Sequence, residues 1–149
     1  MAVPPRGAIR VRAAAPEDLR WVRALVTRAL LEAGYDPPAD ARDADLEDTG
    51  YYEAPGRSLW VAFDEQDRVV GCIALDRGDQ GAAVIRRLAG TGLYALLAAA
   101  VQQARRQRYR VVETVLPPGM DDLRLALESQ GFTPTESGSL LYRRELAAV

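Results

Sequence analysis

Three strand-like runs in succession, followed by a change to helical spacing, constrain the fold of this chain more than any other feature. The runs cover residues 58–63, 68–76 and 82–88, and short stretches of turn-forming residues separate them. Such spacing predicts an antiparallel meander. From Leu93 onward, apolar residues recur at intervals of three and four, which predicts a helix. We therefore expect a sheet whose meander leads into an α/β crossover.

The remaining predicted elements flank this centre. The other strands are expected at residues 8–13, 110–116 and 139–144. The other helices are expected at residues 16–33, 41–47 and 121–130. Together they predict an α/β (α+β) fold with a mixed, mostly antiparallel central sheet flanked by helices. A chain of 149 residues without a linker or repeat is expected to form a single domain over residues 1–149.

The composition excludes several classes of function. All 19 basic residues are arginine, and the absence of histidine excludes Ser-His-Asp and Cys-His catalysis and histidine metal sites. The single cysteine, Cys72, is expected to pack in a strand, and no metal is expected. Mixed charges with a net charge of −2 argue against a nucleic-acid partner. The N-terminal residues lack the apolar region of a signal peptide, and the longest apolar run, Leu93 to Val101, is about half a membrane span, so we expect no membrane partner and a cytoplasmic location.

A glycine-containing turn joins the predicted strand at 82–88 to the helix that follows. This turn and the order of the elements resemble the GCN5-related N-acetyltransferase (GNAT) family over nearly the whole chain. The likeness extends to residues 9–18, 68–75 and 127–132. The resemblance implies an acyl-CoA-dependent N-acyltransferase that uses acetyl-CoA or another acyl-CoA. A small-molecule or peptide amine is implied as the acceptor, attacking the thioester directly, and assembly as a homodimer stays open.

The resemblance also implies where the cofactor pyrophosphate binds. In the family, backbone amides of a loop of the kind Val-x-Pro-x-x-Arg-Gly-x-Gly-x-Gly and the following helix N-terminus hold it, as the helix dipole and the glycines allow. The corresponding residues here are Leu88, Ala89, Gly90, Thr91, Gly92 and Leu93. The loop is shortened, because the Val-x-Pro-x-x stretch has no counterpart, Ala89 stands in place of the arginine, and Tyr94 replaces the last glycine. Alternatively, the segment only joins strand to helix, with Thr91 as the cap.

The expected catalytic acid is missing. The family often draws it from a tyrosine in the late helix, at the position of Leu127, and leucine cannot donate a proton. Tyr142 on the last predicted strand and Tyr94 at the helix start are alternative acids. The shortened loop and Leu127 also support a second hypothesis, in which the protein has the family's fold without its catalysis and binds a ligand or a partner as a regulatory module.

Glu113 is the candidate catalytic base. It lies at the centre of the predicted strand at 110–116 and shares a face with valines, whereas the fifth strand lines the acyl cleft in the family. The alternative is a structural ion pair with Arg86 or Arg87.

Two further clusters have competing interpretations. Tyr51 and Tyr52, close in sequence to Trp60, are candidates for the wall of the acceptor site, or else aromatic residues that cover the core. An arginine cluster suggests phosphate binding, but it lies where a helix is expected to end and where the helix dipole favours cations, so the favoured interpretation is a solvated face. Its members are Arg105, Arg106, Arg108 and Arg110.

Overall fold

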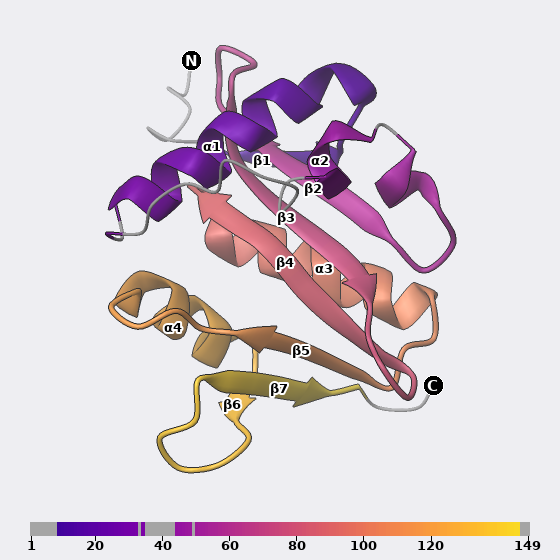
Figure 1. Ribbon diagram of the computed structural model, residues 1–149, viewed down its shortest axis with the longest axis vertical. Coiled ribbons are helices and arrows are strands. Elements are labelled where there is room, and N and C mark those ends of the chain that lie inside the picture. Colours follow the sequence, from indigo (N-terminus) through magenta and orange to yellow (C-terminus); the bar gives the residue numbers. More distant parts are fainter. Residues whose placement is uncertain (1–8, 33, 35–43, 49, 147–149) are drawn as a thin grey trace, which may run out of the picture.

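The computed structural model describes residues 9–32, 34, 44–48 and 50–146. Within them, seven strands form one twisted sheet in the order β1-β2-β3-β4-β5-β7-β6 (Figure 1). The strands are β1 (Arg10–Ala13), β2 (Ser58–Phe63), β3 (Val69–Arg77), β4 (Ala82–Gly90), β5 (Val111–Val115), β6 (Thr133–Pro134) and β7 (Leu141–Glu145). Every neighbouring pair is antiparallel except β4 and β5, which are parallel. The predicted mixed, mostly antiparallel sheet is therefore confirmed.

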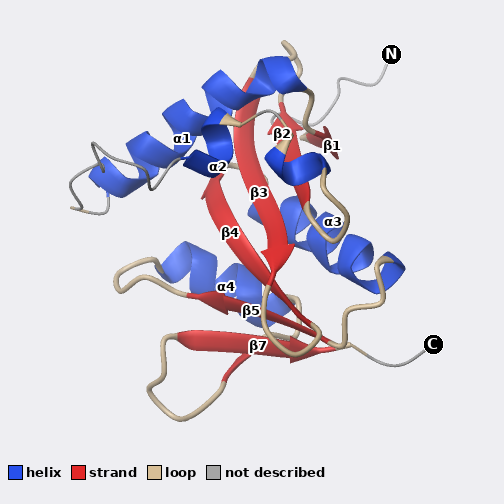
Figure 2. Ribbon diagram, turned by 45° about the vertical axis from the view of Figure 1, so that its right-hand side comes forward, coloured by secondary structure: helices blue, strands red, loops and turns tan. Residues whose placement is uncertain are grey.

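Helices cover both faces of this sheet (Figures 1 and 2). The helices are α1 (Leu19–Glu32), α2 (Ala44–Glu47), α3 (Leu93–Arg106) and α4 (Asp121–Ser129). Helices α1 and α2 lie on one face, and α3 and α4 lie on the other. Helix α3 makes the crossover from β4 to β5, as its helical spacing predicted, because a parallel pair of strands requires a long connection.

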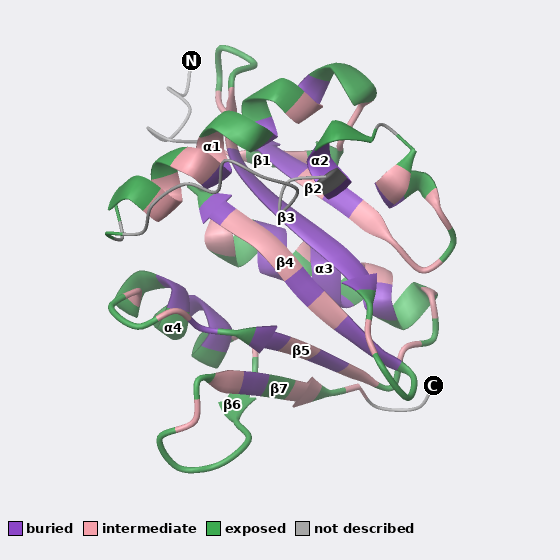
Figure 3. Ribbon diagram, viewed as in Figure 1, coloured by how far each residue is buried: buried purple, intermediate pink, exposed green. Residues whose placement is uncertain are grey.

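Two apolar cores lie on the two faces of the sheet. In β3, Ile73 and Leu75 belong to the core beneath α3 and α4, whereas Cys72 and Ala74 belong to the core beneath α1. Successive side chains of a strand point to opposite faces, so β3 is buried on both sides (Figure 3). The sheet centre is thus fixed by packing, and any opening for a ligand must lie where strands or helices separate.

The predicted elements agree with the structure to within a few residues, with three differences. The predicted first helix begins as a 3₁₀ turn at Pro16–Asp18, and a second 3₁₀ turn covers Tyr51–Glu53. The two-residue strand β6 was not predicted. The predicted helix at 41–47 corresponds to α2, and its first three residues lie outside the described part. None of the helices in the described ranges is long and apolar enough to cross a membrane.

Candidate functional site

A cleft opens where β4 and β5 separate. The two strands pair in parallel over three residue pairs, the last of which joins Val84 to Glu113. Beyond this pair β4 runs on to Gly90 and diverges from β5 (Figure 1). The resulting cleft has a volume of about 180 Å³. It is lined by Val26, Ala29, Leu30, Ile85, Arg86, Arg87, Leu88, Ala89, Thr114, Val115, Pro117, Met120 and Leu123.

A β-bulge in β4 accompanies this divergence. Cys72 pairs with Ala89 and Ala74 pairs with Arg86, so β4 has one residue more than β3 over this stretch. Arg87 has φ 57°, in the left-handed region that few non-glycine residues adopt. A bulge bends the strand that carries it and re-aims its side chains. Here it directs both Arg86 and Arg87 to carboxylates on the α1 and α2 side of the sheet.

Two buried aspartates receive these arginines. Arg86 Nη1 lies 2.9 Å from Asp76 Oδ2, and Asp76 also accepts hydrogen bonds from Arg57 Nε at 2.8 Å and Tyr51 Oη at 2.7 Å. Burial acts to raise the pKa of Asp76, but the hydrogen bonds from Tyr51 and Arg57 outweigh it and hold this pKa below its ordinary value. Asp76 is therefore ionised at neutral pH and joins β3 and β4 to the segment before β2.

Asp45, in α2, accepts hydrogen bonds from an arginine and a tyrosine in the same way. Arg87 donates to it from Nη2 at 2.6 Å and from Nε at 3.1 Å, and the Tyr52 hydroxyl donates to its Oδ2. Burial again opposes ionisation, while these hydrogen bonds lower the pKa of Asp45. Burial, followed by the hydrogen bond to Asp45, raises the pKa of Tyr52. The bidentate pair therefore ties α2 to the bulge beside the cleft.

Neither aspartate was predicted as a site residue. Asp76 lies at the end of the apolar run in the predicted strand 68–76, and a carboxylate that interrupts such a run signals a partner. Asp45 carries no comparable signal, because its partner Arg87 is 42 residues away.

The predicted acceptor residues Tyr51 and Tyr52 lie in this network. Their rings meet edge to face with centroids 4.8 Å apart, and both hydroxyls are bound to the aspartates. Tyr52 shares a separate hollow of about 350 Å³ with Trp60, and neither tyrosine lines the cleft. The structure therefore places both tyrosines behind the cleft wall, where they support Arg86 and Arg87.

The glycine turn from Leu88 to Leu93 is shaped by close packing against β3. Gly90 has φ 83°, and a Cβ there would lie 2.2 Å from the Val70 carbonyl oxygen. A Cβ on Gly71 would lie 2.0 Å from the Thr91 carbonyl oxygen. The Thr91 N–H donates to the Val70 carbonyl at 2.7 Å. Glycine is thus required at this contact by the backbone alone.

The N-terminus of α3 follows directly. Its N-cap is Gly92, with φ 84° and no side-chain capping hydrogen bond, so the prediction that Thr91 caps the helix is wrong. The first-turn amides of a helix have no helical acceptor, and here they lie next to a hollow of about 390 Å³ formed in part by Leu88, Ala89, Gly90 and Leu93.

The electrostatics of this hollow are mixed. The helix dipole of α3 favours an anion at its N-terminus. The hollow is also lined by Glu32 at the end of α1 and by Asp121 and Asp122 at the start of α4, and its described lining includes no basic residue. A phosphate group placed here therefore gains from the dipole and is repelled by the carboxylates.

The candidate catalytic residues lie around the cleft rather than on its walls. Glu113 is half-buried on β5 and pairs in register with Arg143 of β7, and its neighbours Thr114 and Val115 line the cleft. The ion pairs shown for Arg86 and Arg87 go to Asp76 and Asp45, not to Glu113. Glu113 therefore lies at the point of divergence, next to the cleft.

The two candidate acids occupy contrasting environments. Tyr142 is 6% exposed and packs in the core beneath α3 and α4, which also contains the fully buried Leu127. Tyr94 is 55% exposed on the first turn of α3. Neither tyrosine lines the cleft. Cys72 is fully buried, and burial raises the pKa of its thiol to about 12, as expected for a packing residue.

Comparison with solved structures shows what this arrangement is similar to. A GNAT-family acetyltransferase from Staphylococcus aureus Mu50 matches with a TM-score of 0.79 and 16% identity, covering 94% of this chain and 100% of that chain. An acetyltransferase from Streptococcus agalactiae 2603 matches with a TM-score of 0.77 and 22% identity, covering 93% and 98%.

A third structure was solved with a cofactor. A GNAT-superfamily phosphinothricin acetyltransferase from Sinorhizobium meliloti, in complex with AcCoA, matches with a TM-score of 0.77 and 16% identity, covering 93% of this chain and 89% of that chain. No protein-family model and no curated protein matches the sequence. The chain has the fold of the GNAT-family acetyltransferases.

Proposed function

We propose that the protein is an N-acyltransferase that takes its acyl group from acetyl-CoA or another acyl-CoA and transfers it to a small-molecule or peptide amine. The observation that carries this proposal is the divergence of β4 from β5. Beyond Val84, none of the strands in the described part of the chain pairs with β4 on that side, and the Ile85 carbonyl accepts a hydrogen bond from Thr114 Oγ1 at 3.2 Å. An extended ligand with amide groups, such as the pantetheine arm of CoA, can pair with such an edge as an added strand does.

The chemistry requires little more than this edge and a base. The amine attacks the thioester carbonyl carbon, the developing oxyanion is stabilised by hydrogen-bond donors, and the C–S bond breaks to release the CoA thiolate, which takes up a proton. We assign the oxyanion donors to main-chain N–H groups of β4 beyond Val84. Glu113 is the proposed base, accepting the ammonium proton directly or through water. Tyr142 remains the proposed acid, although its burial places it outside the described cleft lining.

The cofactor phosphates are assigned to the hollow at the start of α3, beside Gly90, Thr91 and Gly92. One main-chain amide of this turn is not free to bind them, because the Thr91 N–H is already bound to the Val70 carbonyl. The nearby carboxylates of Glu32 and Asp121 oppose the phosphates. These features favour a second candidate function, a binding module with the GNAT fold that does not transfer acyl groups.

Ligand-dependent stability tests the cofactor assignment. Acetyl-CoA at a hundred times its Kd is expected to stabilise the folded state by about 2.7 kcal/mol. For a domain of this size, that free energy corresponds to a rise in Tm of about 5–10 °C. Val115→Trp is designed to fill the cleft, because Val115 lines it and is 63% exposed. Leu125→Trp is the matched control on α4, away from the cleft, where Leu125 is 51% exposed.

The outcomes separate the alternatives. A rise in Tm in the wild type and in Leu125→Trp, but not in Val115→Trp, supports binding in the cleft. No rise with any CoA ester, or an equal rise in all three proteins, contradicts it. When binding is established, CoA release measured with a thiol reagent over an amine panel distinguishes the transferase from the binding module, and Glu113→Gln tests the base.

A further inference from the structure

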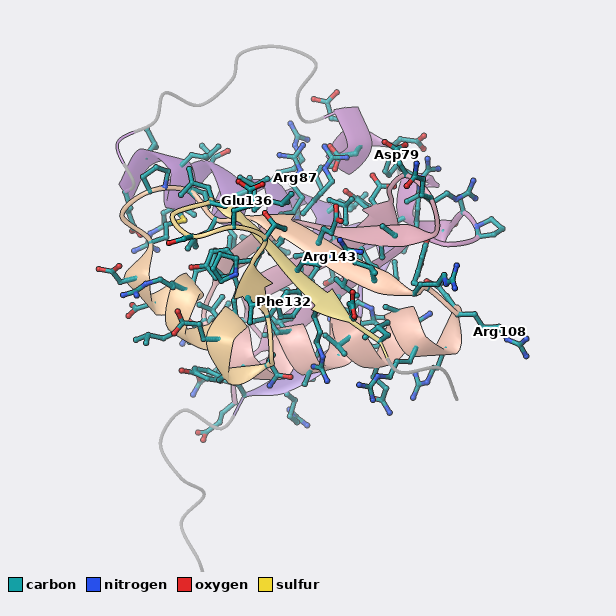
Figure 4. All side chains as sticks on the ribbon, turned by 90° about the horizontal axis from the view of Figure 1, so that it is seen from below. Asp79, Arg87, Arg108, Phe132, Glu136 and Arg143 are labelled. Atoms are coloured by element: carbon teal, nitrogen blue, oxygen red, sulfur yellow. The ribbon has the colours of Figure 1, made fainter. Side chains whose placement is uncertain are left out.

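Arginines gather at the end of the molecule opposite the cleft mouth. They come from the last turn of α3, the connection to β5, and β7, and they line an open hollow of about 820 Å³. The arginines are Arg105, Arg106, Arg108, Arg110 and Arg143. The hollow adjoins the start of β5, whereas the cleft lies at its other end. Figure 4 shows Arg108 extending outward beyond the end of α3, and Arg143 on β7.

These five side chains share one charge environment. In the part of the chain that the structure describes, none of them forms an ion pair with a carboxylate. The nearby carboxylates are Glu145, which lines the hollow, and Glu113, which lies opposite Arg143 in the β5–β7 register. By contrast, Arg86 and Arg87 each bind an aspartate. Like charges brought together repel one another, and an anion removes that cost.

The helix dipole explains only part of the cluster. Cations in the last turn of α3, such as Arg105 and Arg106, complement the negative end of the helix. Arg110, directly before β5, and Arg143, on β7, lie outside the helix, where the dipole gives no reason for a cation. Three separate segments therefore supply positive charge to the same hollow.

Arg108 adds a second indication. It has φ 63°, its N–H donates to the Arg105 carbonyl at 3.0 Å, and the Tyr109 N–H donates to the Ala104 carbonyl at 3.0 Å. This is the Schellman ending of a helix, in which the left-handed position is usually glycine. Arginine at this position lowers stability relative to glycine, so the backbone does not account for its presence.

We propose that this hollow binds a small anion carrying a chain of phosphates, of the triphosphate class. Guanidinium groups bind phosphate oxygens in bidentate geometry, and several arginines lining one hollow suit a multiply charged anion better than a single phosphate. The volume falls in the range of about 300–1,000 Å³ that is usual for small-molecule sites. This site is separate from the cleft and does not depend on the proposed acyltransferase activity.

Isothermal titration with inorganic tripolyphosphate and, separately, with ATP in the absence of magnesium tests the site in the full-length protein. We expect saturable binding with one site per chain that weakens as salt is added. Arg143→Gln is expected to weaken binding about tenfold, the effect of losing a hydrogen bond to a charged group. Arg20→Gln is the matched control, because Arg20 is exposed on α1 and contacts the Trp21 ring.

Arg108→Gly separates binding from folding. Glycine is favoured at this backbone position, so the variant should melt at the same temperature as the wild type or higher, while tripolyphosphate binding falls about tenfold. Equal affinity for the two probes assigns recognition to the phosphate chain, and tighter binding of ATP assigns it to a nucleotide. The proposal is overturned if neither probe binds, if Arg143→Gln and Arg108→Gly bind like the wild type, or if only an RNA oligonucleotide binds.

Val115→Trp keeps this experiment independent of the cleft. If tripolyphosphate occupies the arginine hollow, this variant binds it with unchanged affinity, and saturating acetyl-CoA does not displace it. Loss of tripolyphosphate binding in Val115→Trp would place the anion in the cleft and overturn the proposal. Failure of acetyl-CoA to bind at all would count against the proposed acyltransferase and leave the arginine site unaffected.

Discussion

Substitution of Gly90 by alanine distinguishes a glycine needed for packing from one needed for a ligand. Gly90 has φ 83°, and a Cβ there would lie 2.2 Å from the Val70 carbonyl oxygen and 2.9 Å from the Gly71 Cα. Both neighbours are backbone atoms of β3, so a side-chain rotation cannot relieve the contact. Gly138 is the matched control, because its φ is 81° and a Cβ there would meet nothing within 4 Å.

The two variants share one cost and differ in the other. A left-handed conformation costs an L-residue about 1–2 kcal/mol, and this is the whole expected loss in Gly138→Ala. In Gly90→Ala the added Cβ must also push β4 away from β3. Overpacking of this kind in a core costs a further ~1–3 kcal/mol. We therefore expect the free energy of unfolding to fall by about 2–5 kcal/mol in Gly90→Ala.

Urea denaturation followed by circular dichroism measures both losses at 25 °C. The difference between the variants isolates the contact with Val70, because the backbone term is common to both. If Gly90→Ala is no less stable than Gly138→Ala, the packing explanation is refuted. In that case the glycine would have to be explained by the approach of a ligand to the turn.

Two further predictions concern the buried network and the core. Asp76→Asn should lower the free energy of unfolding by about 1–3 kcal/mol at pH 7, because it removes the negative charge that pairs with both Arg57 and Arg86. The loss is limited because both arginines are partly exposed to solvent. Since the native pKa of Asp76 is depressed, this contribution is complete above the unfolded pKa of about 3.9 and is lost as the pH falls through the native pKa. Thermal unfolding measured from pH 7 to pH 2 should therefore show the Tm values of the variant and the wild type converging only in acid. A difference in Tm that stays constant over this range would contradict the prediction. Leu127→Tyr restores the tyrosine that the GNAT resemblance implies. Because Leu127 is fully buried, the variant should be destabilised by about 1–3 kcal/mol and should gain no acyl transfer. A gain in CoA release would show that the helix can present a phenol to the cleft.

Local patterns in the sequence were sufficient for the element order. The strand-like run at residues 58–63 and the helical spacing from Leu93 correspond to β2 and α3, because both patterns reflect which side chains are buried. The neighbours of Cys72 are typical of a buried strand and predicted that this residue packs there, and it is fully buried. Strand β6 was missed because two residues carry no periodicity.

These local patterns could not predict the geometry of the site. The bulge at Arg87 determines how β4 leaves β5, yet an arginine in the left-handed conformation has no sequence signature. Its partner Asp45 is 42 residues away, and the alternative pairing considered for Arg87 was Glu113. Which of several carboxylates an arginine meets depends on the course of the chain between them. Tertiary contacts therefore decided the ion pairs that local reasoning left open.

The ionisable groups of the cleft bear directly on how it can act. Among its described lining residues, the charged ones are Arg86 and Arg87, and both are bound to aspartates. The described lining includes no carboxylate, phenol or thiol, so proton transfer has to involve groups outside it, such as Glu113 and the proposed acid Tyr142, or else the substrate or water. What the cleft itself offers is the main-chain edge of β4 beyond Val84, where the described strands form no further ladder pairs on that side and which can orient a thioester and stabilise an oxyanion without a titratable side chain. In the proposed reaction, catalysis therefore depends more on that edge than on any single acid or base, and replacing Glu113 should slow acyl transfer without abolishing it.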